Sequence, residues 1–109
     1  MNDFSDTIKK LIEFRDKRDW KQFHNSKDLA IAISIESSEL LELFLWKENE
    51  DVNIEKLKEE LADIFAYSFL LAEKHGLNVN EIVLNKIRKN SEKYPISKAK
   101  GNATKYTDL

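Results

Sequence analysis

The stretch that decides the fold runs from Lys27 to His75 and reads KDLAIAISIESSELLELFLW, then KENEDVN, then IEKLKEELADIFAYSFLLAEKH. Apolar residues recur in both long segments at the spacing of amphipathic helices. This periodicity predicts one helix from about Lys27 to Trp46 and another from about Ile54 to His75. The intervening segment is short and charged, so we expect the two helices to pack as an antiparallel hairpin.

Two further helices are expected to flank this hairpin. The first covers about residues 4–16, and the last runs from about Asn80 to Tyr94, because Pro95 cannot continue a helix. With only 2 Gly and 1 Pro among 109 residues, the chain has few turn formers for a sheet of short strands. The sequence therefore predicts an all-α fold, a four-helix bundle over residues 1–95, followed by a basic C-terminal tail over residues 96–109.

Composition excludes several classes of function. The 18 Lys and Arg residues nearly balance the 20 Asp and Glu residues, which argues against a nucleic-acid binder with a broad basic surface. The absence of Cys excludes disulfides, thiol catalysis and zinc ribbons. The polar N-terminus does not resemble a signal peptide, and no apolar run reaches the ~18 residues that span a bilayer. We expect a cytoplasmic protein with neither a membrane nor a nucleic acid as partner.

Two pairs of acidic residues lie on the apolar stripes of the central helices. Glu36 and Glu39 are three residues apart and share a helix face with apolar side chains, and Glu60 and Asp63 repeat that arrangement on the next helix. An ionised carboxylate on an apolar face is costly unless a counter-charge accompanies it. The hairpin would bring the two pairs together, where four carboxylates repel each other or take up protons.

A hard divalent cation relieves this repulsion. Either pair alone is more typical of a solvated helix face in a chain so rich in Glu, but two pairs on adjacent apolar stripes favour a metal site. An all-oxygen site suits Mg²⁺ or Mn²⁺. Neither His24 nor His75 lies three residues after a Glu, so the spacing of a di-iron bundle is absent.

These motifs resemble a known family. Glu36-Ser-Ser-Glu39 followed by Glu60-Leu-Ala-Asp63 resembles the ExxE…ExxD signature of the MazG-like, all-α nucleoside triphosphate pyrophosphohydrolases. Residues 18–24 (RDWKQFH), 39–46 (ELLELFLW) and 90–95 (NSEKYP) are similar to the dCTP-pyrophosphatase branch. Ser34 and Ser37 stand where that branch usually has Gly, which should alter local packing rather than ligation.

The resemblance implies a reaction and its cofactor. The expected activity is Mg²⁺-dependent hydrolysis of a nucleoside triphosphate, dCTP or a related pyrimidine, to the monophosphate and pyrophosphate. The metal ligands would be Glu36, Glu39, Glu60 and Asp63, with Glu39 as our candidate for the general base. The family forms dimers, often paired into tetramers, and apolar residues away from the acidic stripe need burial, namely Ile31, Leu41 and Leu45.

The resemblance also implies a substrate pocket. The nucleobase would stack on Trp20 and Trp46, with Phe23, His24 and Tyr67 nearby, and the phosphates would lie beside Lys86, Asn90 and Lys93. Taken by themselves, the two Trp residues fit a small core equally well, and the Lys residues fit a solvated basic face.

Two alternatives stay open. The same chemistry could act on another substrate such as phosphoribosyl-ATP, although the paired Trp residues suit a compact nucleotide better. A non-enzymatic helical interaction module, such as an antitoxin-like or scaffold dimer, would need no inward-facing acids.

Overall fold

The computed structural model describes residues 4–109, and over that range the chain is helical and has no strand. This confirms the expected all-α class. The α-helices are α1 (Ser5–Lys17), α2 (Ser26–Glu42), α3 (Ile54–Lys74), α4 (Val79–Lys93) and the short α5 (Ile96–Ala99), and the 3₁₀ turns are η1 (Lys21–Phe23) and η2 (Tyr106–Asp108). The chain divides into two compact units, one ending at Gly76 and the other beginning at Leu77.

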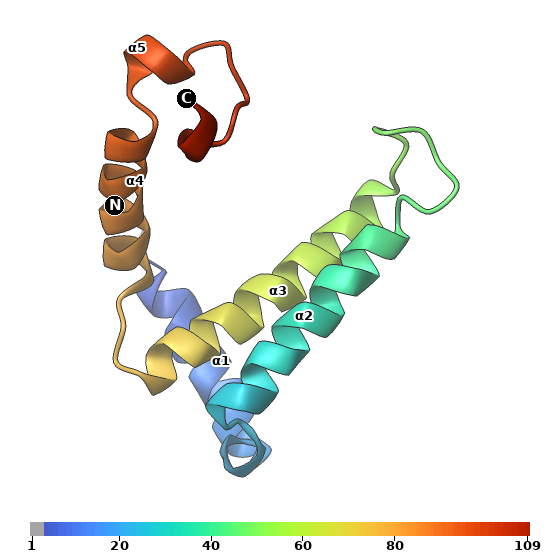
Figure 1. Ribbon diagram of the computed structural model, residues 1–109. Coiled ribbons are helices and arrows are strands. Elements are labelled where there is room, and N and C mark those ends of the chain that lie inside the picture. The colour runs from blue at the N-terminus through green and yellow to red at the C-terminus, as the bar shows by residue number, and fades with distance from the viewer. Residues whose placement is uncertain (1–3) are drawn as a thin grey trace. The chain divides into compact units, whose positions relative to one another are not determined.

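The first unit is built on the hairpin of α2 and α3, which lie side by side and antiparallel, with α1 packed against α3 (Figure 1). Asparagine caps fix where both hairpin helices begin. The side chain of Asn25 accepts a hydrogen bond from the backbone N–H of Asp28 at 2.8 Å, and that of Asn53 accepts one from Lys56 at 3.1 Å. Each cap satisfies a backbone donor that the first helical turn would otherwise leave unpaired.

Helix α2 ends at Glu42, four residues before the expected end at Trp46. The backbone N–H groups of Leu43, Phe44 and Leu45 bond to carbonyls three residues back, so the helix tightens after Glu42. Trp46 then adopts a left-handed conformation with φ of 62°, which no α-helix continues through. The apolar periodicity persists beyond the helix because periodicity reports which face is apolar and does not locate the cap. Helices α1, α3 and α4 match their expected bounds to within one residue at each end.

The core of the first unit lies where α1 and the start of α2 meet the C-terminal half of α3. Leu29 is only 2% exposed, and Phe69, Leu70 and Ala72 are also buried. Burial of one such Leu side chain contributes about 1.5–3 kcal/mol. Ser26 Oγ and His75 Nε2 lie 2.8 Å apart, which ties the start of α2 to the end of α3. These contacts set the axial register of the hairpin, and therefore which turns of the two helices face each other.

The second unit consists of α4 and the residues that follow it. Asn78 caps α4 by accepting a hydrogen bond from the N–H of Glu81 at 3.0 Å. Tyr106 in η2 contacts the end of α4: its ring meets Tyr94 edge-on at 5.9 Å between centroids, and Lys93 Nζ lies 4.8 Å from its centroid. The division into a domain and a tail at residue 95 stays a prediction. None of the helices in residues 4–109 combines the length and apolarity that a membrane crossing requires.

Candidate metal centre

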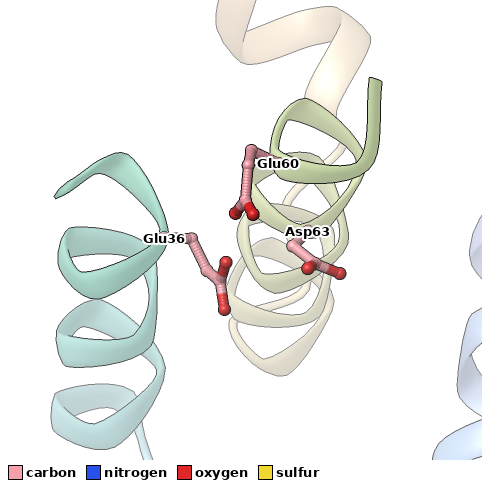
Figure 2. Close-up of side chains that lie close together, drawn as sticks. All are labelled: Glu36, Glu60 and Asp63. Atoms are coloured by element: carbon pink, nitrogen blue, oxygen red, sulfur yellow. The ribbon is translucent and has the colours of Figure 1, made fainter. Parts of the chain in front are cut away.

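Three carboxylates meet between the two helices of the hairpin. Glu36 lies on α2, and Glu60 and Asp63 lie one turn apart on α3. One oxygen from each of the three lies within 4.8 Å of the others. Figure 2 shows Glu36 extending from its helix toward the two acids on α3. The hairpin thus joins acids that are 24 or more residues apart in the sequence.

Burial makes two of these acids, Glu36 and Glu60, hard to ionise. Glu36 and Glu60 are half-buried, and the Oε2 atom of each is buried without a hydrogen-bond partner among the described residues. Burial, reinforced by the neighbouring Glu39 and Glu60 carboxyl groups, raises the pKa of Glu36 to about 7. Burial also raises the pKa of Glu60, and the charges of Glu39 and Asp63 act in the same direction. Crowded carboxyl groups away from water favour the protonated form unless a cation is present.

Glu39 adjoins this centre without joining the group of three. It follows Glu36 by one turn on α2, and its side chain is exposed. Its charge still acts on both Glu36 and Glu60, as the causes of their raised pKa values show. The fourth predicted acid therefore lies at the rim of the cluster.

The donor set fits a hard divalent cation. Such ions prefer carboxylate oxygens, and a cation would coordinate the two buried oxygens that have no hydrogen-bond partner within residues 4–109. Asp63 is exposed, so one side of the cluster is open to a ligand. The arrangement can hold a cation and present it to an anionic group that approaches from solvent.

A pocket of about 290 Å³ adjoins the acids and shares Asp63 with them. Three of the predicted substrate residues line it, namely Trp20, His24 and Tyr67. The backbone N–H of Trp20 bonds to the carbonyl of Arg15 at 3.1 Å, which folds the connector back against α1. The Trp20 ring then meets Phe14 edge-on at 5.7 Å between centroids. An aromatic wall therefore stands beside the carboxylate cluster.

Two polar groups in this pocket have shifted pKa values. Burial and the negative charges of Glu36, Asp63 and Glu39 raise the pKa of Tyr67, so its hydroxyl stays protonated and can donate a hydrogen bond. Burial, and next the positive charge of Arg15, lower the pKa of His24, which favours the neutral imidazole. His24 Nδ1 is buried and lacks a hydrogen-bond partner among the described residues.

Phe23 and Trp46 do not line this pocket in the part of the chain that the structure describes. Phe23 is 63% exposed, and Trp46 is 94% exposed beyond the C-terminal end of α2, whereas Trp20 precedes the start of that helix. A single chain therefore does not place both indoles around the same pocket.

The three predicted phosphate contacts lie on α4, in the second unit. Lys86 and Asn90 line a shallow groove together with Ile82, Val83 and Ile87. Lys93 lies over the Tyr106 ring, as described above.

The sequence reasoning missed Arg15. This residue is only 5% exposed and lines the pocket that also contains Trp20 and Tyr67. Its Nε donates to Asp16 Oδ1 at 2.9 Å, and its Nη1 donates to Glu73 Oε2 at 3.2 Å. The hydrogen bond with Asp16, followed by that with Glu73, raises the pKa of Arg15 against the opposing effect of burial. The sequence did indicate that Arg15 lies on the apolar face of its helix, because it follows Ile8 and Leu11 at the i, i+3, i+7 spacing of one face.

Fold and site together define an all-α protein with an acidic centre inside an antiparallel helical hairpin. The model of the MazG-like family matches residues 31–109, and the chain belongs to that family.

Individual relatives agree with this assignment. The chain is 39% identical over 105 residues to dCTP pyrophosphatase 1 of Bos taurus and 36% identical over 105 residues to that of Mus musculus. Each match covers 89% of this chain and 62% of the relative, so the chain spans about three fifths of the length of these curated relatives. A solved pyrophosphatase from Archaeoglobus fulgidus DSM 4304 is 37% identical with a TM-score of 0.78, covering 87% of this chain and 94% of that one.

Proposed function

We propose that the protein is a Mg²⁺-dependent nucleoside triphosphate pyrophosphohydrolase that converts dCTP or a related pyrimidine nucleotide to the monophosphate and pyrophosphate. The observation that carries this proposal is the meeting of Glu36, Glu60 and Asp63, where two buried carboxylate oxygens have no hydrogen-bond partner in the part of the chain that the structure describes. Similarity to proteins named dCTP pyrophosphatase and pyrophosphatase supports the reaction class.

The carboxylate cluster would hold the cation. Glu36, Glu60 and Asp63 are the proposed ligands, and Glu39 adjoins them as the fourth acid. When bound, Mg²⁺ would offset phosphate charge and increase the acidity of a water molecule. Because Glu36 and Glu60 resist ionisation without a counter-charge, cation binding should release protons from this cluster.

Glu39 is the proposed general base. Its side chain is exposed and lies outside the group of three, so it is available to accept the proton of an attacking water. Its position one turn after Glu36 keeps it beside the place where the phosphates would lie. Glu39 also remains a proposed fourth ligand of the cation.

The pocket beside the cluster is the proposed base site. Trp20 supplies an aromatic surface, and stacking on such a surface contributes roughly 1–3 kcal/mol per base. His24 and Tyr67 supply polar edges. Because Asp63 belongs to both the pocket and the cluster, one nucleotide can reach both with its base and its phosphates.

Other predicted contacts rest on the family resemblance. Phe23 and Trp46 remain proposed contributors to base binding. Lys86, Asn90 and Lys93 remain proposed donors to the phosphates, where ammonium and amide groups complement negative charge.

The proposed assembly is a homodimer or a pair of dimers. Leu41 is 72% exposed, and Ile31 and Leu45 are also exposed, although all three are large apolar residues of the hairpin segment. A second copy would remove this surface from water. Sedimentation of wild type and Leu41→Lys tests this, with Ile96→Lys in the second unit as the control. We expect Leu41→Lys to sediment as a monomer, while wild type and Ile96→Lys sediment as oligomers. A monomeric wild type would contradict the proposed assembly.

A pyrophosphate-release assay tests the proposed reaction. Wild type with Mg²⁺ should release pyrophosphate from dCTP, whereas Glu36→Gln, Glu39→Gln, Glu60→Gln and Asp63→Asn should each lose at least ~10²-fold in turnover. Glu50→Gln, in the exposed loop after α2, is the matched control and should retain full activity. Undiminished wild-type turnover in excess EDTA would overturn the proposal, and the absence of both turnover and Mg²⁺ affinity would favour an interaction module.

A further inference from the structure

Arg15 is a buried cation in the wall of the proposed base pocket, and no role in the reaction described above uses it. Its side chain also lines a second cavity of about 150 Å³, which shares Arg15, His24 and Leu70 with the base pocket. Arg15 and His24 therefore lie between two adjoining cavities. Both residues therefore contribute polar groups to the wall of the base pocket.

The guanidinium of Arg15 is held on two sides. Asp16 engages Nε at 2.9 Å and Glu73 engages Nη1 at 3.2 Å, so the plane of the group is fixed by two carboxylates. Nη2 has no hydrogen-bond partner among residues 4–109. Because the two carboxylates offset the charge, what Arg15 has left to offer a ligand is directed N–H groups rather than net positive charge.

His24 supplies a complementary group in the same wall. Its Nδ1 is buried and unpaired within the described part of the chain, which is unusual because buried polar atoms normally have partners. Burial and the nearby Arg15 favour the neutral imidazole, in which Nδ1 can act as an acceptor. The pocket wall therefore combines N–H donors on Arg15 with an unused acceptor on His24.

Building on the proposed function, we propose that Arg15 is a specificity-determining residue that reads the pairing edge of the substrate base and, with His24, selects cytosine over uracil. Cytosine presents adjacent acceptors at O2 and N3 and a donor at its N4 amino group. Guanidinium N–H groups match the two acceptors, and His24 Nδ1 matches the amino group. Uracil presents an N–H at N3, which would face an N–H donor of Arg15, and an acceptor at O4, which would face the acceptor on His24.

Substrate selection in Arg15 variants tests this inference. Wild type should favour dCTP over dUTP in kcat/KM by about 10- to 100-fold, as expected for a well-placed pair of hydrogen bonds to a base edge. Arg15→Met should reduce this ratio to within about threefold of unity, and Arg15→Lys, which keeps the charge without the fork, should also lower it. Circular dichroism and thermal unfolding establish that each variant is folded. If Arg15→Met does not fold, the ratio of kcat/KM for dCTP and dUTP in Arg15→Lys serves as the test.

Glu73→Gln is the matched control, because it breaks the same ion pair and leaves the guanidinium in place. It should lower the thermal midpoint while keeping the preference for dCTP. An unchanged ratio in a folded Arg15 variant would overturn the inference. An equal loss of the ratio in Glu73→Gln would also overturn it, since the preference would then depend on the charge of Glu73 rather than on the guanidinium N–H groups.

A binding measurement separates this inference from the proposed reaction. Titration of wild type with dCMP and with dUMP, followed by tryptophan fluorescence, should show tighter binding of dCMP, and Arg15→Met should remove the difference. Arg15-dependent preference for dCMP without pyrophosphate release from dCTP would uphold the inference and reject the proposed reaction. Pyrophosphate release from dCTP and dUTP at equal kcat/KM would uphold the proposed reaction and reject the inference about Arg15.

Discussion

Glu36 on α2 and Glu60 on α3 face each other across the hairpin, and each has a buried Oε2 atom without a hydrogen-bond partner in the described chain. An unpaired carboxylate oxygen away from water is unfavourable for a protein that only needs to fold. The pair is therefore better explained by a ligand that the two helices hold between them than by packing alone.

Mg²⁺ should stabilise the folded protein through this pair. At about 100 times its Kd, a ligand that binds only the folded state adds about 2.7 kcal/mol, which corresponds to a rise in Tm of roughly 10 °C for a small domain. Thermal unfolding with and without Mg²⁺ measures this shift. Glu36→Gln should remove most of it, and the exposed Glu50→Gln should not. An equal shift in Tm for wild type, Glu36→Gln and Glu50→Gln would show that the cation binds outside the acidic cluster.

The metal-free protein should lose stability as the pH rises. The pKa of Glu36 is about 7 in the folded state, against an ordinary value of 4.5, so between these values the folded state holds a proton that the unfolded state has released. The stabilising contribution of this proton is fully present below pH 4.5 and is lost as the pH rises through 7. Urea unfolding in EDTA at about pH 5 and about pH 8 checks the free energy of unfolding.

Glu36→Gln supplies the comparison for this pH dependence. The amide does not titrate, so the variant should lose less stability between the two pH values than wild type loses. Glu50→Gln should behave as wild type does. Equal pH dependence in Glu36→Gln and wild type would place the titrating group elsewhere.

The acidic cluster could be anticipated from sequence because two regularities coincide. The spacing of Glu60 and Asp63 places both on one helix face. The short loop after α2 means that α3 runs back antiparallel to it. The end of α2 at Glu42 could not be anticipated, since apolar residues continue to Trp46 and no cap signal interrupts them. The role of Arg15 could not be anticipated from its place on the apolar face of α1 alone, because its carboxylate partner Glu73 lies 58 positions away in the sequence.

Trp20 should contribute substrate affinity more than turnover. Loss of its stacking surface in Trp20→Ala should raise KM by roughly 10-fold, which corresponds to about 1.4 kcal/mol, while kcat falls less because the carboxylates are untouched. Trp20→Phe retains a ring and should recover much of the affinity. Steady-state kinetics on dCTP give both constants. An unchanged KM in Trp20→Ala would show that Trp20 contributes to packing and not to substrate binding. The same assay on Trp46→Ala tests the contribution of Trp46.

The bond that is cleaved tests the central claim most directly. A water directed at the α-phosphorus of dCTP releases pyrophosphate in one step, and the oxygen of that water stays with the nucleotide. Reaction of wild type with dCTP and Mg²⁺ in ¹⁸O-water, followed by mass spectrometry of the products, should find the label in dCMP and none in pyrophosphate. Sequential appearance of dCDP and inorganic phosphate, or label in pyrophosphate, would contradict the account.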